Sequence, residues 1–385
     1  MSGADAEVGA SQAVVISAGS GSSEVDLLQK KDGEEKSHSS GVTSWFLSWR
    51  FIGPGLLVCL ADTDAGCLIV AAQSGARWGY SLLLLQVALI PILFLAQELT
   101  IRLGVHTRKG HTACIREHFG VAWAWFACAL LVLECVCAMI SEMSGVAAVG
   151  ELWGLGRFAA TLISAGLLVA VIFFCSYRQV ETIGVIFGLF ELTFVLTMFC
   201  FHPSPSEVFK GSFTFYSDGE YFKLITANIG AVVMPWMIYF QQNAVVARRL
   251  VTSKDLAEER IHTLLGSILT QLVMIGMLVT MAAAHEINKN LHTVHDIATA
   301  MEPVLGSMGS KVLVSLGFLG GSICAAFVVS LASSWAICEA SGWDVAHSLD
   351  ESPTQAPEFY GCFLGVVVIG ILVLNTGVNV VKLNV

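Results

Sequence analysis

Residues 53–76 read GPGLLVCLADTDAGCLIVAAQSGA, an apolar stretch with two carboxylates at its centre. A helix needs about 20 apolar residues to cross a bilayer, so this stretch is long enough to span one. Asp62 and Asp64 would then lie near the middle of the membrane, where a negative charge is most costly. Gly66 follows them and lowers the helix propensity by about 1 kcal/mol. We therefore expect the helix to unwind here, and the carboxylates to hold a cation together with freed backbone carbonyls.

The composition is that of a membrane protein. Hydrophobic residues make up 55% of the 385-residue chain and charged residues 13%, whereas soluble domains carry about 25% charged residues. The mean hydropathy is +0.73. Most of the 11 cysteines lie inside apolar runs, without a C-x-x-C pair or zinc-type spacing, so we expect small packing residues rather than disulfides. Common catalytic motifs such as H-E-x-x-H, the P-loop and G-x-S-x-G are absent, and we do not expect an enzyme.

The first 44 residues differ from the rest of the chain. They are rich in Ser, Gly and charged residues and show no apolar face with a helical period. This composition predicts a disordered tail over 1–44, followed by a transmembrane domain over 45–385. No apolar run lies near Met1, so no cleaved signal peptide is expected.

Nine apolar segments follow the tail, and each is long enough to be a membrane span. They cover 51–76, 80–101, 121–147, 158–176, 183–201, 222–246, 263–284, 312–339 and 360–378. Placing the tail in the cytoplasm puts most of the Lys and Arg residues on the cytoplasmic side. The positive-inside rule therefore predicts a multi-pass membrane protein with a cytoplasmic N-terminus, in a membrane that the sequence does not identify.

A second span carries a helix breaker at a matching position. Residues 230–243 read GAVVMPWMIYFQQN, and Pro235 removes one backbone N–H and clashes with the preceding turn. Two discontinuous helices at corresponding positions of two halves are typical of an inverted-repeat transporter with a midplane site. We therefore predict an all-α integral membrane protein with a LeuT-type inverted repeat, in which the first and sixth spans are discontinuous.

Each repeat of such a fold is expected to contain five spans. The first repeat would cover about 51–201 and the second about 222–385. The second repeat holds only four complete spans, and LNTGVNVVKLNV at 374–385 looks like the beginning of a fifth. We therefore expect the chain to be truncated before its tenth span, and residues 1–385 alone to be unstable or inactive.

The two broken spans resemble those of the Nramp family of divalent-metal transporters, and the similarity runs from about Phe51 to Val385. The first-helix pattern of that family is G-P-G…A-x-x-D-P-G-N…Q-S-G-A, and the stretch quoted above follows it without a gap. The sixth-helix pattern is G-A-V-[IV]-M-P-H, and GAVVMPW stands at 230–236 here.

Four residues depart from the family pattern and indicate which branch of the family the chain resembles. Ala65 stands in place of the motif Pro, Cys67 in place of the metal-ligating Asn, and Trp236 in place of the sixth-helix His. Asp62 has no counterpart in the usual motif. This combination resembles the branch called Nramp-related magnesium transporters.

The resemblance implies a set of metal ligands. Asp64 matches the ligand aspartate, Met234 the thioether ligand, and Ala231 the position whose freed carbonyl faces the ion. Cys67 can act as a soft thiolate ligand, but a thiol in apolar surroundings stays neutral, which favours a small residue that widens the site. Asp62 lies about 200° from Asp64 around a regular helix, so both line one cavity only if the helix unwinds.

Other polar residues inside the spans are candidates for the ion pathway or for contacts around the ion. Glu134, Glu142 and Glu191 lie within spans, and we favour Glu134 for a proton or ion pathway, the alternative being a protonated carboxyl packed against a neighbouring helix. The remaining candidates line the breaks or can bind an ion's water shell: Gly66, Pro235, Trp236, Gln241, Gln242 and Gln271. Trp236 cannot carry a proton, and no histidine is placed as an intramembrane relay.

Three functional interpretations remain open. In the first, the protein takes up magnesium, because an extra carboxylate and the missing Asn suit a partly hydrated Mg²⁺ ion. Mn²⁺ would be a second substrate, and the membrane potential would drive uptake without protons. The soft sulfur of Met234 instead favours a proton-coupled manganese or iron transporter. The missing tenth span favours a truncated paralogue without transport activity. The expected partners are a divalent cation as substrate and the lipid bilayer; we expect no cofactor and no nucleic acid, and no protein partner is indicated.

Overall fold

The computed structural model describes residues 53–284, 291, 293–343 and 349–376. The predicted tail and residues 377–385 lie outside these ranges. All regular elements in the described ranges are helices: α3 (Pro54–Ala61), α4 (Ala65–Trp78), α5 (Leu83–Thr107), α6 (His111–Phe119), α7 (Val121–Leu152), α8 (Arg157–Phe174), α9 (Tyr177–Leu189), the 3-10 turn η1 (Phe190–Leu192), α10 (Thr193–Cys200), α11 (Pro205–Ser212), α12 (Gly219–Val232), α13 (Pro235–Ala247), α14 (Ser253–Ala283), α15 (Val294–Ser341) and α16 (Pro357–Asn375).

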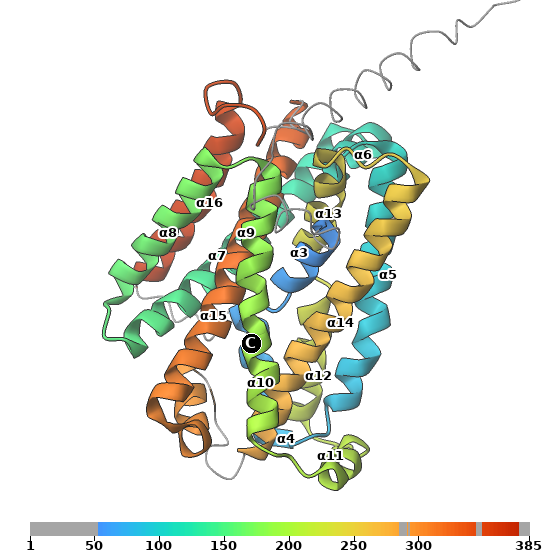
Figure 1. Ribbon diagram of the computed structural model, residues 1–385. Coiled ribbons are helices and arrows are strands. Elements are labelled where there is room, and N and C mark those ends of the chain that lie inside the picture. Colours follow the sequence, from blue (N-terminus) through green and yellow to red (C-terminus); the bar gives the residue numbers. More distant parts are fainter. Residues whose placement is uncertain (1–52, 285–290, 292, 344–348, 377–385) are drawn as a thin grey trace, which may run out of the picture. The chain divides into compact units, whose positions relative to one another are not determined.

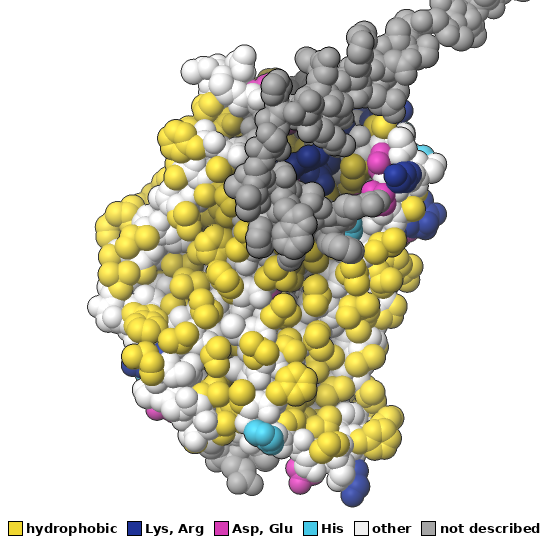
Figure 2. Space-filling view, in the orientation of Figure 1, with side chains coloured by type: hydrophobic (Ala, Val, Ile, Leu, Met, Phe, Trp, Pro, Cys, Tyr) yellow, Lys and Arg dark blue, Asp and Glu magenta, His cyan; other side chains and the backbone are white. Residues whose placement is uncertain are grey.

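The spans agree closely with the sequence prediction. Within the described residues, 8 helical segments are long and apolar enough to cross a membrane, and the bent pair α3–α4 brings the number to 9 if it is one span. The largest extension is in α15, which begins well before the predicted 312 and bends at Gly306, where φ is 73°. Hydrophobic side chains cover the middle of the visible face and charged ones gather toward its ends (Figure 2), as expected of a surface that faces lipid.

The first span is broken where the carboxylates lie. The helix α3 ends at Ala61, α4 begins at Ala65, and the two axes differ by 54°. Asp64 is extended, with ψ 172°, and its side chain accepts a hydrogen bond from the Cys67 backbone N–H. This cap restarts the helix immediately, so Gly66 lies in the first turn of α4 rather than in the unwound segment that we predicted.

The second break is equally short. The helix α12 ends at Val232, Val233 and Met234 are not helical, and α13 begins with Pro235. Proline suits the first position of a helix because the N–H that it lacks would have no partner inside that helix. The predicted break is therefore confirmed, although Trp236 already belongs to the first turn of α13.

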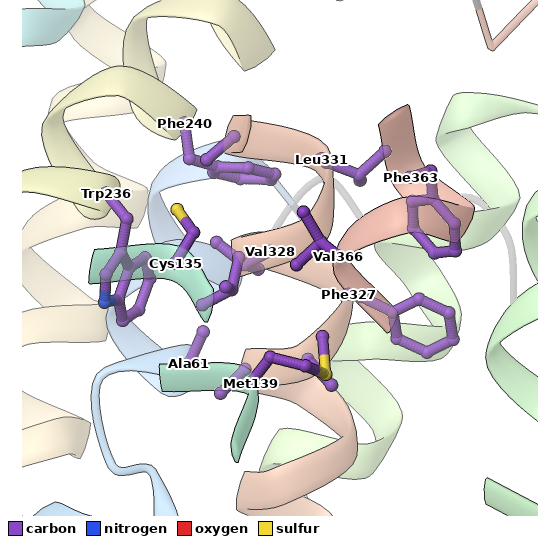
Figure 3. Close-up of a cluster of buried hydrophobic side chains, with 14 of the residues drawn as sticks. Ala61, Cys135, Met139, Trp236, Phe240, Phe327, Val328, Leu331, Phe363 and Val366 are labelled. Atoms are coloured by element: carbon purple, nitrogen blue, oxygen red, sulfur yellow. The ribbon is translucent and has the colours of Figure 1, made fainter. Parts of the chain in front are cut away.

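Two long helices hold the broken first span in place. The helix α14 packs along both α3 and α4, and α15 also packs against both of them. On its other sides, α15 packs against α7 and α9 (Figure 1). The contact with α14 is close because Gly266 has no side chain: an added Cβ would lie 2.7 Å from the Cβ of Cys59. A large apolar cluster that includes Trp236, Phe240 and Phe327 fills the space between α13, α7 and α15 (Figure 3).

Candidate metal site at the two helix breaks

The two breaks meet in the interior of the protein. The thiol of Cys67, in the first turn of α4, donates to the backbone carbonyl of Ala231 near the end of α12, over 3.7 Å. Both residues are buried, and the half-buried Met234 packs against the same cluster. The contact brings together the two half-helices whose ends we expected to form the site.

Asp64 is fixed by its role as a helix cap. Its Oδ1 accepts from the Cys67 N–H at 2.7 Å, and the residue is almost fully buried. The positive end of the α4 dipole points at this carboxylate, which helps to compensate a negative charge in the membrane. Cys67 therefore takes part in two contacts, one through its N–H to Asp64 and one through its thiol to Ala231.

Asp62 is buried in the same break without a partner for one of its oxygens. It is 2% exposed, and its Oδ1 has no hydrogen bond in the described part of the chain. A buried carboxylate oxygen without a partner is costly, so this group calls for a proton or a ligand that the described residues do not supply. Asp62 itself keeps helical backbone angles as the C-cap of α3, and the chain becomes extended at Asp64, so the break lies between the two carboxylates, as we expected if both line the ion path.

Two further carboxylates reach the first break from other helices. Glu142 on α7 accepts from the Ala65 backbone N–H at 3.3 Å, and Glu191 in η1 contacts the Thr63 hydroxyl through Oε2. Both glutamates are fully buried. Sequence reasoning recorded them as acids within spans but chose Glu134 instead, because only the tertiary fold brings them beside the break.

The negative charges of these four carboxylates have to be compensated. Among the described residues, no Lys, Arg or His forms an ion pair with Asp62, Asp64, Glu142 or Glu191. Buried charges in a protein are normally paired, neutralised by a proton or bound to a metal. Cations or protons must therefore balance this cluster.

Glu134 lies at the second break rather than the first. Its partly buried carboxyl lies close to the Trp236 backbone N–H, in the first turn of α13. Glu142 accepts a hydrogen bond from the Ala65 N–H in the first turn of α4. The helix α7 thus offers one carboxyl to the start of each half-helix, where backbone N–H groups lack partners.

The three candidate glutamines behave differently. Gln242 is engaged elsewhere: its side chain contacts the His111 ring at 2.7 Å and the Lys109 carbonyl at 2.8 Å. It therefore joins α13 to the α5–α6 junction and is not free for an ion's water shell, contrary to our expectation. Gln241 and Gln271 are fully buried, and neither amide has a hydrogen-bond partner among the described residues.

Trp236 occupies the position of the family histidine as a packing residue. It is fully buried in the apolar cluster with Ala61 and Cys135 (Figure 3). Within the ranges that the structure describes, no three His, Cys, Asp or Glu side chains are arranged to hold a metal ion. An ion at the breaks would need backbone carbonyls, the Met234 thioether or water in addition to the carboxylates.

Comparison with known proteins gives the family. A family model described as "Natural resistance-associated macrophage protein-like", Nramp, matches residues 55–385. The chain belongs to the Nramp family. Within that family, "Divalent metal cation transporter MntH" of Chromohalobacter salexigens is 26% identical to it over 299 residues, which cover 74% of this chain and 69% of the relative.

Solved structures confirm the predicted LeuT-type fold of this Nramp protein. A manganese transporter of Eremococcus coleocola superposes with a TM-score of 0.69 at 16% identity, covering 90% of this chain and 76% of the other. A Na⁺-coupled sialic acid symporter superposes with a TM-score of 0.61 at 15% identity, covering 84% and 72%. At these identities the similarity shows the fold alone. With its apolar spans, the Nramp protein is a multi-pass integral membrane protein.

Proposed function

We propose that this Nramp-family protein carries divalent metal cations across its membrane by alternating access, with Mg²⁺ as the main substrate and Mn²⁺ as a second. The observation that carries the proposal is the contact between Cys67 and Ala231. It brings Asp64, the cap of α4, close to the second break, which offers the Ala231 backbone carbonyl and the Met234 thioether. The printed name of the Chromohalobacter relative, a divalent metal cation transporter, supports the same substrate class.

The donor atoms around the first break favour a hard cation. Asp62, Asp64, Glu142 and Glu191 all supply oxygen, which Mg²⁺ prefers. The Cys67 thiol already donates to a carbonyl, so it adds no soft thiolate ligand. Mg²⁺ gives up its water reluctantly, and the buried amides of Gln241 and Gln271, which have no partners among the described residues, are our candidates to bind the waters that it keeps.

The driving force in this proposal is the membrane potential rather than a proton gradient. Trp236 stands where the family pattern has a histidine, and an indole cannot take up and release a proton. An inside-negative potential favours the uptake of a cation by about 2.3 kcal/mol per charge per 100 mV, and by twice as much for a divalent ion.

One observation favours the rival function, proton-coupled transport of manganese or iron. Met234 lies at the second break with its thioether near the other candidate ligands, and sulfur ligands select softer metals than Mg²⁺. The carboxyl of Glu134 at the same break could carry the coupled proton.

Flux measurements in proteoliposomes separate the two functions. With imposed potential and pH gradients, Mg²⁺ uptake by the wild type should rise with an inside-negative potential and should not change with the pH gradient. A dependence of uptake on the pH gradient, or the absence of any Mg²⁺ flux, would favour the rival.

Asp64→Ala should abolish uptake of both ions, because it removes the capped carboxylate at the meeting point of the breaks. Glu207→Ala removes an exposed acid on α11 and should leave uptake unchanged. Near-normal uptake by Asp64→Ala would remove this residue from the site.

A further inference from the structure

Two cysteines meet where α15 and α16 pack together at the α6 end of the bundle. Cys338 lies one turn before the end of α15 at Ser341, and Cys362 lies in the second turn of α16, which begins at Pro357. The two thiols lie close to each other, and both are free. They belong to different helices, so only the packing of α15 against α16 brings them together.

The neighbouring contacts hold the two helices together at this level. One turn before each cysteine, the rings of Trp335 and Phe359 contact each other, with 6.1 Å between their centroids. The hydroxyl of Tyr360 donates to the Glu351 carbonyl at 3.0 Å, which ties the start of α16 to the segment before it. The pair of thiols therefore lies between two helices whose side chains are packed against each other.

The pair lies at the end of the bundle that we predict to be cytoplasmic. The residue that follows Cys338, Glu339, accepts a hydrogen bond from the Ala113 backbone N–H in α6, at 3.1 Å. The distribution of Lys and Arg predicts that this end faces the cytoplasm. Cytoplasmic thiols are kept reduced by glutathione and thioredoxin, so a disulfide formed there is transient and responds to oxidants.

The two sulfurs differ in their exposure to an oxidant. Cys362 is partly exposed, whereas Cys338 is fully buried. Oxidation begins at an accessible sulfur and is completed by a neighbouring thiol, so Cys362 has the place of the reactive cysteine and Cys338 that of the resolving one. A further buried cysteine near Cys362 is Cys128 on α7, which is the alternative partner that a test must distinguish.

We propose that Cys338 and Cys362 form a reversible disulfide when hydrogen peroxide reaches this end of the protein, and that the bond fastens α15 to α16. The Cys362 thiolate attacks the peroxide, the O–O bond breaks, and the products are a sulfenic acid and hydroxide. The Cys338 thiol then attacks the sulfenic sulfur, the S–S bond forms, and the sulfenic oxygen leaves as water with the Cys338 proton. The hydroxide takes up the proton that Cys362 lost. Two thiols are thus oxidised, and one peroxide is reduced to two water molecules.

The disulfide would act on transport through α15. Gly321 of this helix is packed tightly against the first break, since an added Cβ would lie 2.6 Å from the Thr63 carbonyl oxygen. A helix that is linked to α16 at one end cannot shift freely against the break, so we expect slower uptake by the oxidised protein. This effect on uptake rests on the proposed transport function, whereas the disulfide itself does not.

Thiol mapping on the purified full chain tests the disulfide without a transport assay. Wild-type protein is treated with hydrogen peroxide, and its remaining thiols are blocked with N-ethylmaleimide under denaturing conditions. A Glu-specific protease then cuts between the two cysteines, for example after Glu351. Mass spectrometry should show that Cys338 and Cys362 lose labelling together and form one linked pair of peptides, which dithiothreitol separates. Cys362→Ser should leave Cys338 labelled, whereas Cys200→Ser, which removes an exposed cysteine on α10, should keep the link.

Free Cys338 and Cys362 in the peroxide-treated wild type would overturn the proposal, and so would a link between Cys128 and Cys362 in its place. The mapping uses the wild type, so it remains decisive if Cys362→Ser does not fold.

Flux in proteoliposomes tests the effect on transport. Uptake of Mg²⁺ and Mn²⁺ by the wild type should fall after peroxide and recover with dithiothreitol, whereas uptake by Cys362→Ser should not respond to peroxide. Unchanged flux in a protein with the mapped link would overturn the lock on α15. An absence of flux before oxidation would count against the proposed transport function and leave the mapped disulfide standing.

Discussion

Asp64 is both a helix cap and our candidate metal ligand. It caps α4 through the Cys67 N–H, and it is the carboxylate that we expect to bind the transported ion. A cation bound to this carboxylate weakens its hydrogen bond to the Cys67 N–H. The positive end of the α4 dipole repels the cation and stabilises the carboxylate without it. Ion binding and the local stability of the first turn of α4 should therefore be linked.

Met234→Ala distinguishes hard from soft ions at this site. Mg²⁺ uptake should continue, because a thioether is a poor ligand for Mg²⁺, whereas Mn²⁺ uptake should fall about tenfold. Transport assays on vesicles with matched protein content measure both. Met308→Ala, which removes a methionine that is 67% exposed on α15, should change neither flux. Loss of both fluxes in Met234→Ala would show that the thioether is needed for hard ions too.

His111 gives a prediction on pH and stability. Its burial lowers its pKa, although the contact with Gln242 opposes this shift. The folded state thus binds its proton less readily than the unfolded chain, whose histidine pKa is about 6.5. The contribution of His111 to stability is therefore present above about pH 6.5 and is lost as the pH falls toward the lowered folded value.

Thermal unfolding in detergent between about pH 8 and pH 5.5 measures this contribution. His111→Asn can keep a hydrogen bond to Gln242 but cannot become charged, so its loss of stability on acidification should be smaller than that of the wild type. His118→Asn, at an exposed position on α6, is the control. An equal acid sensitivity of His111→Asn and wild type would contradict the prediction.

At the scale of helices, the positions of the two breaks could be predicted because their signals are local. The carboxylates and Pro235 act within their own spans, and the length of an apolar run gives the limits of a span. The surroundings of the breaks could not be predicted in the same way. Glu191 reaches Thr63 from η1, and Gln242 turns to His111, because of packing between helices that no periodic pattern records.

Glu142 stabilises a helix to which it does not belong. Glu142→Ala leaves the Ala65 N–H buried without an acceptor and should lower the free energy of unfolding by about 1–3 kcal/mol. Glu142→Gln retains an oxygen that accepts, so it should remain close to the wild type in the same thermal melts. Equal destabilisation by both variants would show that the charge of Glu142, rather than the hydrogen bond, stabilises α4.

At the scale of the whole molecule, the charges at the two ends of the bundle predict its orientation in the membrane. The junction before α6 and the short helix α11 lie at opposite ends of the bundle (Figure 1). The distribution of Lys and Arg predicts that the α6 end is cytoplasmic. Short epitopes inserted at the exposed Lys109 and Lys210 should then be reached by antibody from opposite sides of the membrane, with only the Lys109 epitope accessible from the cytoplasmic side. The reverse labelling would contradict the predicted orientation.

The helix α7 joins the two halves of the molecule in an asymmetric way. Its Glu142 accepts from the Ala65 N–H at the start of α4, whereas its Glu134 lies close to the Trp236 N–H at the start of α13, which we predict to belong to the other repeat. A rocking motion between repeats can leave the first contact intact but must stretch or release the second. Each release would expose a carboxyl and an amide to entering water at the same moment. The contact between α7 and the start of α13 would then be made and broken once in each transport cycle.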